Sequence, residues 1–196
     1  GRAGTGGHCV VNDLLLALAG TLAGLLYLAR EHSRVAVAKR GFGEQLQHHA
    51  ALLKRRAAVV TEYLEWAQRS GSDSPADLDR LSDHQTQAEH SCNNLGRHPG
   101  DRQALVAFKA SGVQMLGSRE ALAVATQGKG AASEGERGPA LLLELERLDR
   151  SLAEQTRTTC TLAELLDQTR RRPAARLSSL VAHFGILPGA SWGFRS

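Results

Sequence analysis

The stretch Leu14–Ala29 reads LLLALAGTLAGLLYLA, sixteen consecutive residues without a charge. A bilayer core of roughly 30 Å is crossed by about twenty helical residues, each rising about 1.5 Å. Tyr27 lies near one end of the stretch, where an amphipathic ring is favoured at a membrane interface. We therefore predict a transmembrane helix over 10–29, preceded by a short extracytoplasmic N-terminus over 1–9.

Two alternatives remain open for this apolar stretch. A buried core helix of a soluble bundle has a similar composition, and so does a cleaved signal peptide near an N-terminus. The signal peptide is disfavoured because only one basic residue, Arg2, precedes the stretch. The stretch is also longer than the roughly 7–15 apolar residues of a typical signal peptide. The sequence thus favours a permanent anchor.

Basic residues follow the stretch closely, whereas Arg2 stands alone before it. The basic residues that follow within about twelve positions are Arg30, Arg34, Lys39 and Arg40. Because cytoplasmic flanks carry the excess of Lys and Arg, the N-terminus is expected outside and the rest of the chain in the cytoplasm. Each of these cations gains about 1 kcal/mol near anionic lipid. The predicted location is the cell inner (plasma) membrane.

One face of the predicted anchor carries only small side chains. These are Ala17, Gly20, Thr21 and Gly24, of which the two glycines form a G-x-x-x-G pair. Small residues at this spacing let a second membrane helix approach closely. The face therefore predicts a homo-oligomer.

The rest of the chain is predicted to be all-α. Aromatic residues make up only 4% of the chain, and Ala and Leu dominate, which favours helices over sheets. Apolar or small residues recur every 3.6 positions on average after the anchor, so one long helix is expected to continue from the membrane. They are Val35, Ala38, Phe42, Leu46, Ala50, Leu53, Ala57, Val60, Leu64 and Ala67.

Prolines and glycines divide the remainder into further helices. We expect helices from Pro75 to about Leu95, over Arg102–Gln127 with Asp101 as its cap, from Pro139 to Pro173, and onward to Phe184 with Gly185 as the C-cap. The fourth carries a stripe of Leu141, Leu145, Leu148, Leu152, Leu162 and Leu166. Short connections favour an antiparallel bundle over 30–184. In the apolar tail, 185–196, Trp192 and Phe194 are expected to contact a partner or the bundle end.

Two stretches resemble the LemA family, a family of bacterial single-pass membrane proteins with a cytoplasmic helical bundle. The first comprises Val35, Ala38, Phe42, Gln45, Leu46, Leu52, Leu53 and Tyr63. The second comprises Leu141, Glu144, Leu145, Glu146, Asp149 and Leu152, and is followed by Pro173, Phe184 and Gly185. Lys39 replaces the tryptophan of the family motif, and the family's two Tyr-Asn pairs are missing. The resemblance implies an N-out anchor and membrane-associated organising work without established catalytic residues.

Residues with metal-binding or catalytic chemistry do not form a recognised motif. His48 and His49 point about 100° apart on a helix, so we interpret them as solvated or core-edge residues. Glu144, Glu146 and Asp149 are expected to pair with basic residues of neighbouring helices. The run from Lys54 to Arg56 is interpreted as a solvated face or a protein contact. We predict no cofactor, no metal site and no catalytic residue.

These observations predict a non-enzymatic, membrane-anchored helical scaffold that organises protein partners at the cytoplasmic face. A net charge of +4 is too small to indicate nucleic-acid binding. The alternatives are a membrane-tethered sensor or adaptor that transmits a signal along the long helix and a metal-dependent enzyme. Neither the partner nor the pathway follows from the sequence.

Overall fold

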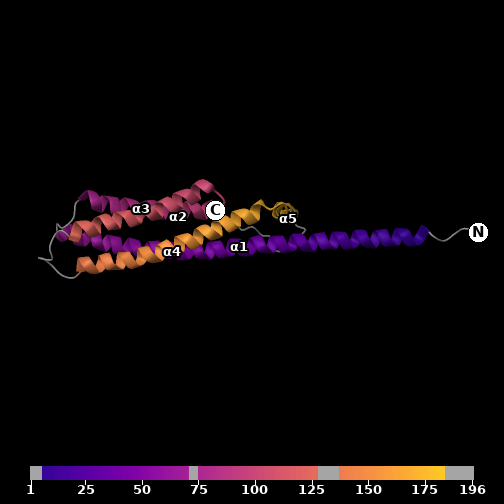
Figure 1. The fold of residues 1–196 in the computed structure, drawn as a ribbon, viewed down its shortest axis with the longest axis horizontal. Helices are drawn as coiled ribbons and strands as arrows, with labels where there is room; N and C mark the ends of the chain where they lie inside the picture. Colours follow the sequence, from indigo (N-terminus) through magenta and orange to yellow (C-terminus); the bar gives the residue numbers. More distant parts are fainter. Residues whose placement is uncertain (1–5, 71–74, 128–136, 184–196) are drawn as a thin grey trace, which may run out of the picture. The chain divides into compact units, whose positions relative to one another are not determined.

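The computed structural model describes residues 6–70, 75–127 and 137–183, which are helical except at 98–101 and 172 and contain no strand. The helices are α1 (Gly6–Ser70), α2 (Pro75–Arg97), α3 (Arg102–Gln127), α4 (Arg137–Arg171) and α5 (Pro173–His183) (Figure 1). The predicted all-α fold is confirmed. The first helix is 65 residues long and runs without a break through the apolar stretch and the periodic segment after it.

Local chemistry explains most of the helix boundaries. The Asp101 carboxylate accepts a hydrogen bond of 2.8 Å from the backbone N–H of Gln103. This bond satisfies one of the backbone donors that the first turn of α3 leaves without a helical acceptor. α4 begins at Arg137, so the prediction that Pro139 opens this helix was wrong by two residues. Proline is tolerated there because first-turn amides lack a helical acceptor. The predicted cap at Gly185 lies outside the described residues.

The chain forms two compact units. The bundle unit, Arg40–Asp167, contains the second half of α1 and most of α4 together with α2 and α3. The terminal unit comprises Gly1–Lys39 and Gln168–Ser196, which bring the start of α1 together with the end of α4 and with α5. The helices α1 and α4 thus contribute to both units.

Buried positions in the bundle unit follow alternating steps of three and four residues, the spacing of a coiled-coil seam. On α1 the seam comprises Phe42, His49, Leu53, Arg56, Val60, Tyr63 and Ala67, with Leu46 half-buried. On α2 it comprises Leu78, Leu81, Gln85, Ala88, Cys92 and Leu95. On α3 it comprises Ala104, Phe108, Ser111, Met115 and Ser118. All ten residues of the stripe predicted for α1 are buried or half-buried, so that prediction is confirmed.

Contacts between the helices show an antiparallel arrangement. Gln45 near the start of the bundle part of α1 hydrogen-bonds Gln155, whereas Glu62 further along pairs with Arg137 near the start of α4. α1 and α4 therefore run in opposite directions. α2 is antiparallel to α1 as well, because Gly96 near its end lies against Leu46 near the beginning of the α1 seam.

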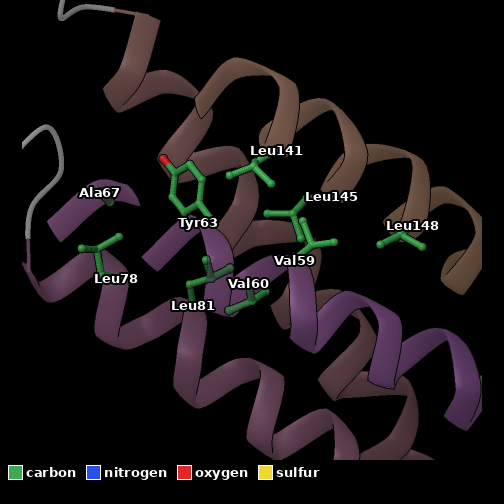
Figure 2. Packing of buried hydrophobic residues seen from close by; sticks show 9 residues of the cluster. All are labelled: Val59, Val60, Tyr63, Ala67, Leu78, Leu81, Leu141, Leu145 and Leu148. Carbon is green, nitrogen blue, oxygen red and sulfur yellow. The ribbon is translucent and has the colours of Figure 1, made fainter. Parts of the chain in front are cut away.

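A leucine-rich cluster fills one end of the bundle unit (Figure 2). Tyr63 of α1 is fully buried among the α2 side chain Leu81 and the α4 side chains Leu141 and Leu145. The α4 stripe predicted from the sequence is buried, except for Leu162, which is half-buried. Burying each such side chain stabilises the fold by about 1.5–3 kcal/mol.

Gly138 allows a close approach between Trp66 and the first turn of α4. A Cβ atom at this position would lie 2.4 Å from two atoms of the Trp66 indole ring. Overpacking of this kind costs about 1–3 kcal/mol. We expect Gly138→Ala to lower the free energy of unfolding by this amount and to change the tryptophan emission spectrum. Thermal unfolding followed by fluorescence measures both effects.

Gly117→Ala is the matched control, since nothing lies within 4 Å of a Cβ atom at that helical position. Replacing an unhindered helical glycine by alanine is expected to stabilise the protein by about 0.5–1 kcal/mol. Equal effects of the two substitutions would contradict a steric role for Gly138.

Candidate functional site

The apolar stretch of α1 is exposed around its whole circumference. Large side chains that are about half exposed or more are Leu14, Leu15, Leu16, Leu18, Leu22, Leu25, Leu26 and Tyr27. The small residues Ala17, Gly20, Thr21 and Gly24 on the remaining face are exposed as well. Because successive helical residues point about 100° apart, the exposed residues together cover every direction around the helix axis. α1 is also the one helix of the described part of the chain that is long and apolar enough to cross a membrane. The core-helix alternative does not fit a segment that this chain itself leaves uncovered.

The predicted small face of the stretch is open. Ala17, Gly20, Thr21 and Gly24 are all exposed, and a Cβ atom at either glycine would meet nothing within 4 Å. The Thr21 hydroxyl donates to the Leu18 carbonyl at 2.8 Å, so its donor is satisfied within the helix. The face therefore offers close backbone access without an unsatisfied polar donor.

A buried carboxylate that the sequence pattern did not predict, that of Glu31, follows the apolar stretch and pairs with one of the basic residues there. Arg30, Arg34 and Arg40 are exposed and Lys39 is half-buried, whereas the side chain of Glu31 is only 3% exposed. Arg34 donates to Glu31 Oε1 at 2.7 Å. This pairing within α1 neutralises part of the cluster.

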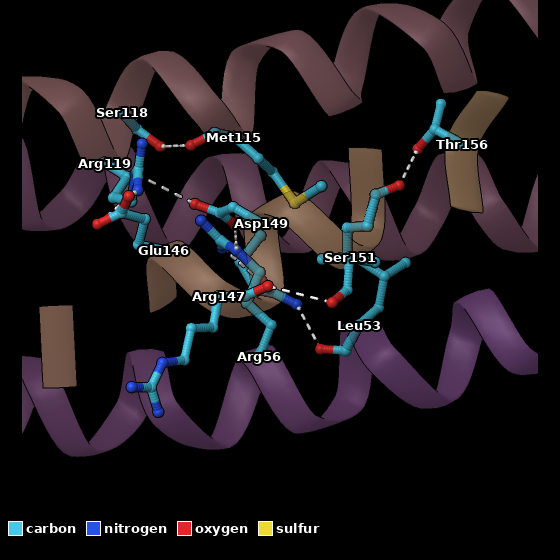
Figure 3. Close-up of polar contacts among 12 residues, drawn as sticks. Leu53, Arg56, Met115, Ser118, Arg119, Glu146, Arg147, Asp149, Ser151 and Thr156 are labelled. Atoms are coloured by element: carbon cyan, nitrogen blue, oxygen red, sulfur yellow. Dashed lines mark hydrogen bonds and ion pairs between the residues drawn. The ribbon is translucent and has the colours of Figure 1, made fainter. Parts of the chain in front are cut away.

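A buried polar layer crosses the bundle unit between α1, α2 and α4 (Figure 3). Arg56 is fully buried, and its Nε donates to Asp149 Oδ1 at 2.6 Å. Its Nη1 donates to Gln85 Oε1 at 2.7 Å. The interpretation of the run Lys54–Arg56 as a solvated face or a protein contact was wrong for Arg56, because the seam places it in the core. Lys54 and Arg55 are exposed as expected.

Other groups complete the layer. Figure 3 shows Asp149 between Arg56 and Arg119, whose Nε lies 3.4 Å from Asp149 Oδ2. Gln85 donates to the Leu53 carbonyl at 3.1 Å. Burial raises the pKa of the Asp149 carboxyl above its ordinary value, and the guanidiniums of Arg56 and Arg119 oppose this rise. The carboxylate therefore holds two cations at the centre of the bundle.

The acidic cluster predicted on α4 pairs with neighbouring helices, as expected. Glu144 lies 3.0 Å from Arg55 of α1, and Glu146 lies 3.8 Å from Arg119 of α3. Together with the buried pair at Asp149, these contacts confirm the prediction. The carboxylates are thus occupied in joining helices.

A groove of about 500 Å³ lies between α3 and α4 and reaches Asp149. Its walls are mainly apolar and include Val113, Met115, Leu116 and Leu152. At its rim, Lys109 Nζ lies 2.9 Å from Glu164 Oε1. The groove could take a small apolar molecule with a polar group directed at Asp149.

The histidines and cysteines whose side chains the structure describes are not arranged as a metal centre. No group of three potential ligands occurs among the described residues. His48 is exposed, as expected for a solvated residue. His49 is only 2% exposed, and the centroid of its ring lies 4.8 Å from that of Phe108. It is therefore a core residue and lies deeper than the predicted edge of the core. Cys92 and Cys160 are free and buried, and burial raises the pKa of Cys92 to about 11. These side chains contribute to packing.

The burial of His49 predicts that acid destabilises the protein. Burial, with a smaller contribution from His48, lowers the pKa of His49 from 6.5 to about 4. The unfolded chain therefore binds a proton that the folded chain does not, so stability is lost as the pH falls from 6.5 towards 4. The loss due to His49 is expected to reach about 3 kcal/mol at pH 4. Urea unfolding at a series of pH values measures it.

His49→Leu should remove this part of the pH dependence, since leucine does not titrate. The exposed neighbour provides the control, because His48→Gln should keep most of it. An unchanged pH dependence in His49→Leu would show that other groups cause the acid sensitivity.

Most positions of the resemblance to the LemA family are buried or half-buried. Those that are buried are Phe42, Leu53, Tyr63, Leu141, Leu145, Asp149 and Leu152. Those that are half-buried are Val35, Ala38, Gln45, Leu46, Leu52, Glu144 and Glu146. Pro173 is the first residue of α5, while Phe184, Gly185, Trp192 and Phe194 lie outside the described residues. The resemblance thus concerns packing positions.

The fold and the exposed stretch define an all-helical bundle protein with one candidate membrane-spanning helix. No family model, curated protein or solved structure matches the chain. A functional proposal must therefore be built on the chain's own residues.

Proposed function

We propose that this protein is a non-enzymatic helical scaffold, anchored in a membrane by α1, that organises protein partners beside that membrane. The observation that carries the proposal is the apolar stretch around Leu18 and Leu22, which is exposed on all sides. Such a surface is stable in lipid but costs free energy in water. The same helix continues into the bundle unit, so the anchor and the folded part belong to one element.

The distribution of charge supports an orientation with the bundle in the cytoplasm. The cluster from Arg30 to Arg40 follows the apolar stretch, and only Arg2 precedes it. This asymmetry favours an N-terminus outside the cell inner membrane. The resemblance to the LemA family is in keeping with a bacterial protein of this topology.

Two features support a structural role in assembly. Arg56 and Asp149, the charged groups at the centre of the bundle, form an ion pair with each other. The open face at Gly20 and Gly24 can accommodate a second copy of α1. We therefore propose that the protein self-associates through its anchor and presents its bundle units to protein partners.

Fractionation of bacterial cells expressing the full chain tests the anchor. The protein is expected in the membrane pellet after an alkaline carbonate wash, and a C-terminal tag is expected to survive protease added outside intact cells. Recovery of the chain in the soluble fraction would overturn the anchor. Digestion of the tag would overturn the orientation.

Mass photometry of the full chain in detergent tests assembly. Oligomers larger than a dimer of the 21.0 kDa chain, after correction for detergent, support a scaffold, and Gly20→Leu with Gly24→Leu is expected to reduce them. Ala19→Leu with Ala23→Leu, outside the small face, is the matched control. A monomer would overturn self-association.

A sensor or adaptor is the second candidate, and the groove between α3 and α4 favours it. A molecule bound there would lie beside Asp149, and therefore beside the ion pair that joins α4 to α1. A discrete dimer in detergent, together with a change in thermal stability on adding apolar compounds, would favour this function over a scaffold.

A further inference from the structure

We propose that arginines from the two ends of the chain form one binding site for anionic lipid headgroups just beyond the apolar stretch. The site combines residues 30–39 of α1 with the end of α4 and the first turn of α5, all within the terminal unit. This inference rests on the proposed membrane anchor. It adds a second set of binding residues to the cations that follow the apolar stretch.

A buried carboxylate connects the two ends. Arg172, which lies between α4 and α5, places its Nη1 atom 4.0 Å from Glu31 Oε2. The Glu31 side chain is 3% exposed, whereas that of Arg172 is 57% exposed. The contact therefore holds Arg172 beside α1 while more than half of its side chain stays exposed.

The contact lies close to the end of the apolar stretch. Glu31 follows Tyr27 by four residues, which is about 6 Å along a helix. This distance is shorter than the Debye length of about 8 Å at physiological ionic strength. Charges held beside Glu31 are therefore close enough to act on headgroups at the level of Tyr27.

The charge of the combined site is strongly positive. Residues 28–39 and 168–183 contain a single acidic residue, Glu31. The basic residues in these ranges are Arg30, Arg34, Lys39, Arg170, Arg171, Arg172 and Arg176. Seven cations and one anion leave a net charge of +6, so the surface complements the phosphates of anionic lipids.

The outer surface of α5 fits contact with a membrane surface. Ala175 and Ser178 are buried, whereas Arg176 and Leu177 are exposed. An exposed leucine beside an exposed arginine combines apolar contact with headgroup binding, the pattern of helices that lie at a membrane interface.

Stabilisation of a helix end is the other role for the arginine run. Cations favour a helix C-terminus, and Arg170 and Arg171 lie in the last turn of α4. Stabilisation of the helix end explains why cations lie close to the end of α4. It does not explain why Arg172 contacts Glu31, which belongs to a different helix. The lipid site accounts for both.

Native mass spectrometry of the detergent-solubilised full chain tests the proposal. Phosphatidylglycerol and phosphatidylcholine are titrated separately, and lipid adducts are counted. The wild-type chain should bind phosphatidylglycerol more tightly. Replacing Arg170, Arg171 and Arg172 together by Gln should weaken its binding roughly 100-fold, since each cation near a lipid surface contributes about fivefold. Replacing all three by Lys should largely preserve it.

The matched control is the triple variant K54Q/R97Q/R147Q, which removes the same charge from exposed positions of the bundle unit and should bind like the wild type. Equal phosphatidylglycerol binding by both Gln variants would overturn the proposal. Displacement of the lipid by inorganic phosphate would overturn it in favour of a general anion site. Circular dichroism confirms that the variants are folded. Loss of carbonate-resistant membrane retention would instead contradict the anchor itself, so the two failures are distinguishable.

Discussion

Replacing Leu18 and Leu22 by arginine is expected to release the chain from membranes. Both side chains lie near the middle of the apolar stretch and are about 60% exposed, so the substitutions disturb no packing within the chain. At the centre of a membrane helix, arginine costs about 2.5–3.5 kcal/mol, whereas leucine contributes about 0.3–0.6 kcal/mol of stabilisation. The double substitution therefore opposes insertion by roughly 6–8 kcal/mol. The carbonate-resistant fraction should fall from nearly all of the protein to a small remainder.

Leu143 and Leu165 supply the matched control. They are exposed leucines of α4, at 51% and 48%, and lie in the bundle unit. The L143R/L165R variant should stay in the membrane pellet, because its new charges lie outside the proposed span. If both double variants pellet equally, the stretch around Leu18 does not anchor the protein.

Asp149→Ala is expected to destabilise the bundle by about 3–5 kcal/mol. The substitution leaves the fully buried Arg56 without its carboxylate partner, and removal of one member of a buried ion pair has a cost of this size. Arg119, which is 3.4 Å from the same carboxylate, loses a partner as well. The midpoint of thermal unfolding should fall by roughly 10 °C, measured by circular dichroism of the full chain in detergent.

Two controls separate the ion pair from the loss of a side chain. Glu144→Ala breaks the exposed pair with Arg55 and should cost less than about 1 kcal/mol. The double variant R56M/D149L replaces the buried pair with apolar side chains and should recover most of the lost stability, while the lost contacts of Arg119 and Gln85 account for the remainder. A double variant no more stable than Asp149→Ala would contradict the interpretation that the unpaired Arg56 causes the loss.

Helix positions could be predicted from the sequence because their signals are local. The predicted bounds of α3 coincide with those observed, since Asp101 supplies a cap before it. Proline at 75 and at 173 marks the first residue of α2 and of α5. The period of 3.6 identified the buried side of α1 for the same reason, as it depends only on neighbouring residues.

The buried charges could not be predicted in this way. Arg56 belongs to a run of three cations that looks solvated when read along the chain. Its burial depends on Asp149, a residue more than ninety positions away, and the burial of Glu31 is likewise linked to Arg172. Steps of three and four residues from Leu53 to Arg56 to Val60 were the available signal. They place position 56 in the seam, but they do not identify its partner.

The position of the buried layer also determines how the helices align lengthwise. Leu141 and Leu148, like Leu145 and Leu152, are spaced by one heptad in α4, so shifting this part of α4 by seven residues, or about 10 Å, would still bring leucines against α1. Such slippage would separate Arg56 from Asp149 and leave both ions unpaired in an apolar interior. The Arg56–Asp149 salt bridge thus fixes the register of α4 against α1, because it forms only in the observed alignment.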